Sequence, residues 1–527
     1  MVAPELETDV HRLAALLPRP LCTILFLFLL SCALVIGSFV WQGRYGFDFG
    51  DEGFLWYGVQ RVHAGEVPVR DFMSYDLGRY YWSAALTGLL QDNGIMALRA
   101  AVALFQLFGL FSALLFLTQD RTRSDACLLV LAAITLLVWM YPRHKLFDTS
   151  LSILLAGILA FLLRQPSHRR FFIAGIGLGL VATFGANHGA YGVAGLVSAV
   201  VYMACTQRNV TTLLPGVGLA GCGAIVGYLP ILATAVFVPG FATAFLDGIL
   251  TILQRGTNLP LPVPWPWLVA FAELPPWDAT AAALTGAFFI VILAFGILSV
   301  LWIIRRALQL RPVQPELVAC SVLALPYAHV AFSRADVAHL AQAIFPFLLG
   351  IFILLKEWPT KARRLAALAM AAASVTMMSP LHPGWECRAT QQPCSTAEVA
   401  GDLLVVHSET ARSLAMLTDV TEKYASNGRN FLVTSWPGAY AALERRSPIW
   451  EIYALFPQGD RLQRREIERI KTARLGLVLI LNIPLDGRDD LRFRNTHPLV
   501  EQFIRENFDA ITIEEWDPQV FQFYKTR

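Results

Sequence analysis

The chain has 527 residues, of which 56% are hydrophobic and 15% are charged. Soluble domains usually carry about 25% charged residues, so this composition excludes an ordinary soluble protein. The net charge of +3 is too small to suggest nucleic acid as a partner. Apolar runs of roughly 17 to 25 residues recur along the chain, which is the length that crosses a bilayer. They predict a polytopic α-helical membrane protein.

The first apolar run, Leu21 to Val40, is too long for the h-region of a signal peptide, which has about 7 to 15 residues. It is interpreted as a retained first helix. Eleven spanning segments are predicted in all, near 21–40, 97–118, 125–141, 147–163, 170–186, 189–205, 213–237, 281–304, 316–332, 337–355 and 363–379.

Short basic loops follow every second predicted helix: "QDRTRS", "RQPSHRR", "TQRN", "RRALQLRP" and "KEWPTKARR". The positive-inside rule makes these loops cytoplasmic, and the N-terminus with them. The opposite, outer face then carries the loops 41–96, 141–148, 185–191, 238–280 and 332–340, and everything after about 380.

The region 381–527 is charged and is predicted to be a soluble α/β domain outside the membrane, following a transmembrane domain over 1–380. Strands are expected at 430–435, 475–481 and 510–516, and helices at 397–425, 463–474 and 497–507. "WDPQ" at 516–519 suggests a hairpin turn. Cys387 and Cys394 lie in a polar stretch and are expected to form a disulfide if that stretch faces an oxidising compartment.

The first outer loop contains "GFDFGDEGFLWYG" (46–58), with Asp48, Asp51 and Glu52 directly after a predicted span. The segments 53–64 and 79–90 have helical spacing with a broad apolar face, which predicts two amphipathic helices at the membrane surface. One of these acids could simply cap a helix, since a carboxylate is stabilised at a helix N-terminus. Capping alone does not explain three of them.

The other outer loops bring many cations and a few further polar groups to the same membrane level. Cations can neutralise a phosphate leaving group, and a carboxylate can take the proton of an attacking hydroxyl. The candidate substrate-binding residues are Arg70, Asp71, Tyr75, Arg79, Arg143, His144, Lys145, His188, Arg255, Arg334, Asp336 and His339.

Several of these residues have a structural alternative. Arg143 to Lys145 could be interfacial side chains that snorkel toward water. His188 could be a packing histidine. Asp336 could cap the helix that is predicted to start near 337.

The stretch 47–99 resembles the GT-C class of membrane glycosyltransferases, which includes protein O-mannosyltransferases and the bacterial enzyme that adds aminoarabinose to lipid A. The resemblance rests on an acidic pair, a small helix, "RDF" (70–72), "YDLGRY" (75–80) and a second helix. It implies a GT-C-like fold and an inverting transfer of sugar from a polyprenyl-phosphate donor to a glycan, lipid or protein acceptor.

By the same resemblance, Asp51 would be the catalytic base, with Glu52 beside it. Asp48 is the alternative candidate for the base, and Arg334 would contact the lipid phosphate. No organic cofactor is implied. A divalent cation, Mg²⁺ or Mn²⁺, could bind Asp48, Asp51 and Glu52, since oxygen ligands suit these ions. The sequence departs from the family where "YDLG" replaces the more usual "YPPG", and where Asn187 stands in place of a basic residue. Both departures leave the sugar open.

Three other functions remain open at this point. A transporter or lipid flippase would bind its substrate near the bilayer midplane, often between repeated halves, and no repeat is seen here. A surface-polysaccharide ligase would carry cations in a large late outer loop, but 238–280 contributes only Arg255. A non-catalytic scaffold is the third. Residue usage favours a bacterial inner membrane.

Overall fold

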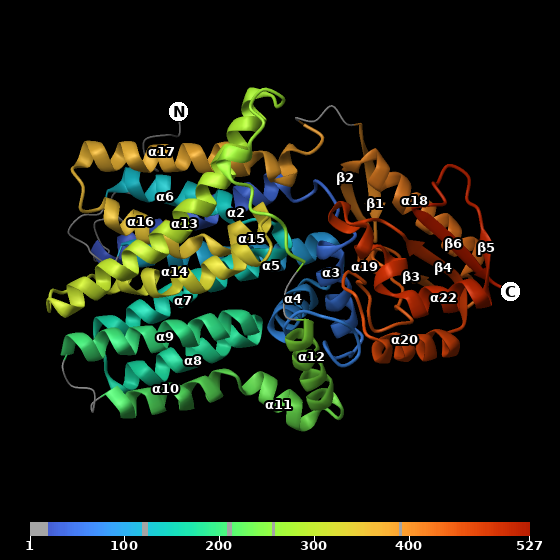
Figure 1. Cartoon of the computed structure of the whole chain (residues 1–527), viewed down its shortest axis with the longest axis horizontal. Helices are drawn as coiled ribbons and strands as arrows, with labels where there is room; N and C mark the ends of the chain where they lie inside the picture. Colours follow the sequence, from blue (N-terminus) through green and yellow to red (C-terminus); the bar gives the residue numbers. More distant parts are fainter. Residues whose placement is uncertain (1–18, 119–124, 208–212, 256–258, 389–392) are drawn as a thin grey trace, which may run out of the picture.

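The computed structural model describes residues 19–118, 125–207, 213–255, 259–388 and 393–527. A body of long, roughly aligned helices carries an α/β domain at one end (Figure 1). The helices of the body are α2 (Arg19–Gln42), α5 (Ile95–Leu117), α6 (Ala126–Trp139), α7 (Leu146–Arg164), α8 (His168–Phe184), α9 (Ala186–Gln207), α10 (Leu213–Gly227), α11 (Leu229–Phe237), α13 (Pro276–Leu308), α14 (Pro315–Ser333), α15 (Val337–Ala343), α16 (Phe345–Leu355) and α17 (Thr360–Met378).

Helices form at all eleven predicted segments, but the predicted number of spans is not confirmed. Within the described ranges, seven helices are long and apolar enough to cross a membrane, or nine if each bent pair counts as one span. The bent pairs are α10 with α11, at 54°, and α15 with α16, at 52°. Pro230 and Pro346 stand in the first turns after the two breaks, and proline cannot continue a preceding helix without losing a hydrogen bond.

The first loop forms the two predicted helices, α3 (Asp51–His63) and α4 (Leu77–Leu90). However, α3 is buried from Glu52 through Gln60, whereas an amphipathic surface helix would leave one face exposed. The α/β domain packs against the side of α3 that does not face the helical body. Gly438 donates its N–H to the carbonyl of Phe49 at 2.8 Å. A Cβ on Gly53 would lie 2.3 Å from the Cα of Gly438, so this close approach requires glycine.

The C-terminal domain has a four-stranded sheet in the order β3-β4-β6-β5, with β3 (Asn430–Val433) parallel to β4 (Leu475–Leu481). β5 (Phe508–Ile511) and β6 (Phe521–Thr526) are antiparallel, so the hairpin that "WDPQ" suggested forms. The strand predicted over 510–516 is wrong after Ile511, because residues 512–520 form the connection between the two strands. The α-helices of this domain are α18 (Ser408–Tyr424), α19 (Pro437–Ala442), α20 (Asp460–Thr472), α21 (Phe493–Thr496) and α22 (Pro498–Asn507).

The helix predicted over 397–425 is wrong in its first part. Residues 394–407 form an antiparallel hairpin of β1 (Cys394–Val399) and β2 (Asp402–His407), and α18 begins only at Ser408. Ala400 and Gly401, between the strands, both have positive φ, of 47° and 86°. A two-residue turn with positive φ at both positions matches the twist of paired strands.

The domain is tied to the first loop along its length. Tyr57 Oη accepts a hydrogen bond from the N–H of Ser447 at 2.9 Å, and Gln60 Nε2 donates to the carbonyl of Ala441 at 3.1 Å. One continuous cluster of buried apolar side chains runs from α2 into the sheet. The first loop, with α3, and the C-terminal α/β domain therefore form one packed layer. The long loop predicted over 238–280 also contains a helix, α12 (Phe241–Arg255).

Candidate active site

Asp48 organises the start of α3. Its carboxylate accepts hydrogen bonds from the N–H groups of Gly50 at 2.8 Å, Asp51 at 3.0 Å and Glu52 at 3.3 Å. These are the N–H groups that a helix leaves unpaired at its N-terminus. Burial and the neighbouring carboxylate of Asp51 raise the pKa of Asp48 above its usual range. Asp48 thus serves as the cap that the sequence allowed.

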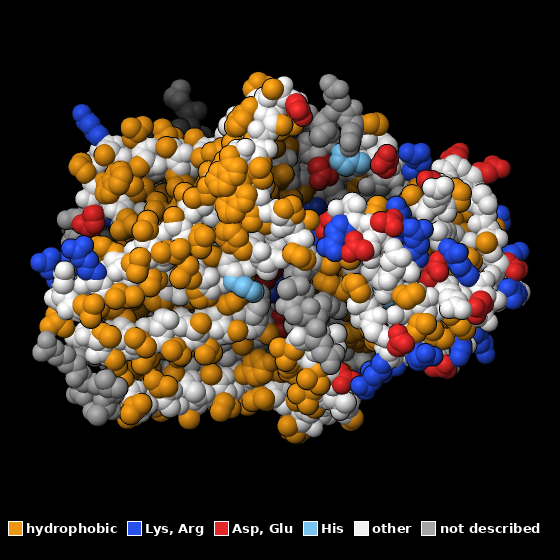
Figure 2. Space-filling model, viewed as in Figure 1, with side chains coloured by type: hydrophobic (Ala, Val, Ile, Leu, Met, Phe, Trp, Pro, Cys, Tyr) orange, Lys and Arg blue, Asp and Glu red, His pale blue; other side chains and the backbone are white. Residues whose placement is uncertain are grey.

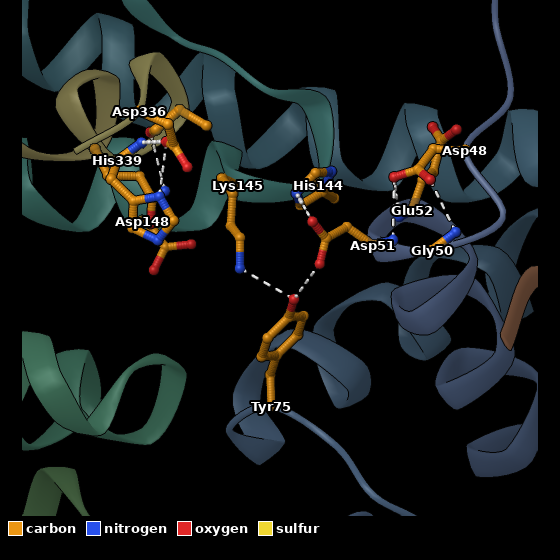
Figure 3. Close-up of polar contacts among 12 residues, drawn as sticks. Asp48, Gly50, Asp51, Glu52, Tyr75, His144, Lys145, Asp148, Asp336 and His339 are labelled. Carbon is orange, nitrogen blue, oxygen red and sulfur yellow. Dashed lines mark hydrogen bonds and ion pairs between the residues drawn. The ribbon is translucent and has the colours of Figure 1, made fainter. Parts of the chain in front are cut away.

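Asp51, at the first position of α3, points away from the helix axis into a polar cluster (Figure 3). Its Oδ1 accepts a hydrogen bond from Tyr75 Oη at 3.0 Å, and its Oδ2 lies 3.4 Å from His144 Nε2. Lys145 Nζ donates to the same Tyr75 oxygen at 3.0 Å and lies 4.2 Å from the centre of its ring. Tyr75 therefore links the lysine to the carboxylate.

The side chain of Asp51 is 39% exposed although protein surrounds it on most sides, as expected in a cleft. Figure 2 shows a hollow between the helical body and the α/β domain, with acidic side chains visible inside it. Burial alone would raise the pKa of Asp51, but the charges of His144 and Lys145 and the hydrogen bond from Tyr75 lower it below its ordinary value. Asp51 stays ionised and reachable.

Glu52, the next residue, is fully engaged inside the protein. Arg99 donates to both of its carboxylate oxygens, at 2.8 and 2.7 Å, and Arg143 lies 3.5 Å away. Arg99 also donates to the carbonyls of Gly43 and Gly46, which holds the loop onto α5. Burial opposes ionisation, but the two arginines outweigh it and lower the pKa of Glu52 to about 2. This contact holds Glu52 away from Asp51's cleft, so a catalytic or metal-binding role for it loses support.

A second closed network lies deeper in the body. Arg79 of α4 donates to both oxygens of Asp148 on α7, each at 2.7 Å. His188 Nε2 lies 2.9 Å from Asp148 Oδ1, and its Nδ1 lies 2.6 Å from Tyr327 Oη on α14. All four side chains are buried. Arg79 and His188 thus join helices rather than face the cleft.

Asp148 was missed as a candidate, although the sequence carried a signal for it. An ionisable residue inside an apolar helix is a candidate for function or pairing by default, and "LFDTSLSILL" has that pattern. Arg99, in the first turns of the apolar helix α5, carried the same signal and was also missed.

The late motif 333–339 is paired within the protein. Asp336 caps α15 by accepting the N–H of His339 at 2.8 Å, as its alternative interpretation predicted. Arg334 donates to Asp336 at 2.8 Å and, through both terminal nitrogens, to Asp486 of the α/β domain at 2.7 Å. Arg334 therefore joins the helical body to the last domain.

Two further candidates do not join the cluster around Asp51. Arg70 and Asp71 pair with each other at 2.7 Å and close a turn, with Asp71 accepting the N–H of Val67. Arg70 also donates to the carbonyl of Pro239 at 3.3 Å. The side chain of Arg255 lies outside the described residues. Cys387 and Cys394 are joined by a disulfide, with their Cα atoms 5.6 Å apart.

A divalent cation would find a different ligand set from the predicted one. Single ligand atoms of Asp48, Asp51 and His144 lie within 4.8 Å of one another. Two carboxylates and an imidazole suit Mn²⁺ or Zn²⁺. These three residues fit a cation, with His144 in the place that the sequence interpretation gave to Glu52.

Comparison with known proteins gives a fold. No family model matches the chain, and neither does any curated protein. Among solved structures, ArnT from Cupriavidus metallidurans in the apo state is 13% identical, with a TM-score of 0.51 over 95% of this chain and 97% of that one. The chain has the GT-C fold of ArnT.

Two other structures are similar by the same measure. ArnT bound to undecaprenyl phosphate is 12% identical, with a TM-score of 0.49 over 94% of this chain and 97% of that one. The oligosaccharyltransferase of Archaeoglobus fulgidus in the apo form is 14% identical, with a TM-score of 0.48 over 96% and 74%. The similarity to ArnT in the apo state confirms the GT-C resemblance inferred from residues 47–99 as a fold, and the reaction is argued from the site.

Proposed function

We propose that the protein is an inverting glycosyltransferase that moves a sugar from a polyprenyl-phosphate donor to a hydroxyl group of a glycan, lipid or protein acceptor. The observation that supports this most is Asp51, an ionised carboxylate in an open cleft with cations beside it. The GT-C fold favours this reaction, and the ArnT structure with undecaprenyl phosphate indicates the class of donor.

In this reaction the acceptor oxygen attacks the anomeric carbon while the bond from that carbon to the phosphate oxygen breaks. The phosphate leaves as an anion and needs no general acid. Asp51 accepts a hydrogen bond from the attacking hydroxyl, orients it, and takes its proton as the new bond forms. The lowered pKa of Asp51 keeps it ionised, so it can accept this proton as the new bond makes the hydroxyl acidic.

The groups around Asp51 have distinct tasks in this mechanism. Tyr75 fixes the orientation of the carboxylate through its hydrogen bond at 3.0 Å. Lys145 supplies positive charge beside the point where negative charge develops on the leaving phosphate, and the His144 imidazole lies 3.4 Å from Asp51 on the other side. A divalent cation held by Asp48, Asp51 and the neutral imidazole of His144 would supply Lewis-acid neutralisation of that phosphate. In this role Asp48 and Asp51 would act together.

The membrane setting is also a proposal. We place the cleft and the α/β domain at the outer face of a bacterial inner membrane, with the N-terminus in the cytoplasm. The Cys387–Cys394 disulfide supports this side, because disulfides persist in oxidising compartments. The alternatives lose support, because Asp51 lies at the end of the body beside the soluble domain and not midway along the spans.

The test is transfer of label from a panel of radiolabelled polyprenyl-phosphate sugars to membrane glycolipids or other acceptors, by purified protein in nanodiscs. Asp51→Asn keeps the shape and removes the charge, and we expect transfer to fall at least about a hundredfold, the scale of a general base. The matched control is Asp419→Asn, an exposed acid on α18 of the α/β domain. Equal transfer by wild type and Asp51→Asn would overturn the assignment of the base. Wild type that transfers no sugar from a panel covering hexose and pentose donors would contradict the proposed reaction.

A further inference from the structure

Helix α12 carries an apolar face that the protein leaves uncovered. Leu246, Ile249, Leu250 and Leu253 are all exposed, and Leu253 reaches 70%. At about 100° of rotation per residue these four side chains fall within one arc of about 100°. A stripe of leucine-size side chains facing water is costly and marks a contact surface.

The surroundings of α12 indicate what covers this face. The helix follows the bent pair α10–α11, whose last residues Val236 and Phe237 are also exposed, Phe237 at 81%. Figure 2 shows the hydrophobic surface of the helical body continuing over α11 and α12 to the edge of the α/β domain. The apolar face of α12 is therefore continuous with the lipid-facing surface of the spans.

Helix α20 of the α/β domain lies against the polar edge of α12. Arg461 and Arg465 lie 4.0 and 3.5 Å from the carboxylate of Asp247. Asp247 follows Leu246 and is turned by about 100° from it, so it marks the border between the apolar face and water. Arg464, on the same side of α20, is exposed.

The charges on this side of α20 are mostly positive. Glu468 and Lys471 pair with each other at 2.7 Å and cancel. Three arginines then face the two acids Asp247 and Asp460, and no acidic partner contacts Arg464 among the described residues. Figure 2 shows Lys and Arg side chains along the edge of the domain next to α12.

We propose that α12 and α20 form one contact with the membrane surface. The apolar face of α12 lies in the interfacial layer, and Arg461, Arg464 and Arg465 bind the phosphates of anionic phospholipid head groups. An interfacial helix sinks roughly 5 to 10 Å into the boundary between head groups and acyl chains. Arginines within 4.0 Å of its polar edge therefore lie at head-group level, where guanidinium groups bind phosphate by paired hydrogen bonds.

The experiment compares hydrogen–deuterium exchange of the full-length protein in nanodiscs of phosphatidylcholine alone and of phosphatidylcholine with phosphatidylglycerol. We expect peptides covering α20 and α12 to exchange about tenfold more slowly with the anionic lipid. High salt should remove this protection, since exposed charges are screened. The variant Arg461→Gln/Arg464→Gln/Arg465→Gln should show none.

The matched control is Arg412→Gln/Lys423→Gln/Arg429→Gln, which removes the same charge from exposed positions at the other side of the domain. It should keep the lipid-dependent protection. Arg464→Gln alone disturbs no ion pair with Asp247 and should reduce the protection in part. Identical exchange in both lipids, or equal protection in the triple arginine variant, would overturn the proposal.

Discussion

Asp51 and Glu52 are adjacent in sequence, chemically almost the same, and placed in opposite environments. Glu52 is held between Arg99 and Arg143 in the interior, whereas Asp51 meets a tyrosine hydroxyl and an imidazole at the edge of a cleft. Because successive residues of a helix point about 100° apart, one step along α3 is enough to turn a carboxylate from the core to the cleft.

This difference distinguishes a carboxylate that stabilises the fold from one that is able to react with a substrate. Glu52 has both oxygens satisfied by one bidentate arginine, which leaves little capacity for a substrate. Asp51 is ionised and still has lone pairs free to accept a hydroxyl. A carboxylate that is charged, oriented and incompletely paired is the one to test for chemistry.

The largest expected effect comes from Glu52→Gln. Removing one partner of a buried ion pair leaves Arg99 and Arg143 uncompensated, and should lower the free energy of unfolding by about 3–5 kcal/mol. Chemical unfolding in detergent micelles measures it. Asp51→Asn is the neighbouring control and should change stability by no more than about 1 kcal/mol. If both variants lose the same stability, the contrast between the two acids is wrong.

The second effect is a pH dependence of stability that belongs to Glu52. Its pKa falls from an ordinary 4.5 to about 2 on folding, so the stabilisation is complete above pH 4.5 and is lost as the pH falls toward about 2. The gap in stability between wild type and Glu52→Gln should therefore stay constant from neutrality to about pH 4.5 and narrow below it. A gap that stays constant down to pH 3, within about half a kcal/mol, would refute this origin.

The smallest effect expected is that of Tyr75→Phe. The variant removes the hydroxyl that joins Lys145 to Asp51 and leaves the ring in place. One lost hydrogen bond to a charged group is worth about 1.5 kcal/mol, so kcat should fall roughly tenfold with KM little changed. Steady-state transfer kinetics measure both. Tyr81→Phe, on an exposed face of α4, is the control. A larger change in KM than in kcat would mean that Tyr75 binds substrate instead.

Hydropathy was sufficient to predict the helical body. All eleven predicted segments are helices, and α3 and α4 lie where the amphipathic patterns placed them. Length alone did not settle which helices cross the membrane, because α6 has only 14 residues and the pairs α10–α11 and α15–α16 are bent. These features depend on packing between helices.

The candidate site was predicted as a set of residues but not as a set of partners. The sequence placed Asp51, Tyr75, His144 and Lys145 at one membrane level, and the structure brings them together. The sequence could not show that Asp148 pairs with Arg79 or that Asp486 pairs with Arg334, since the partners lie 69 and 152 residues apart. The hairpin 394–407 was missed because its turn needs positive φ at Ala400. Alanine rarely adopts this conformation, and the local sequence does not indicate it.

The contact between Gly53 and Gly438 determines when the cleft can form during synthesis of the chain. The loop that carries Asp51 is made early by the ribosome, while the surface that covers it, with Gly438, is made almost four hundred residues later. Until that last part arrives, one side of α3 lacks its neighbour. The cleft around Asp51 is therefore finished only when the C-terminal domain has been synthesised and has packed onto α3, so a partly made chain lacks the complete candidate site.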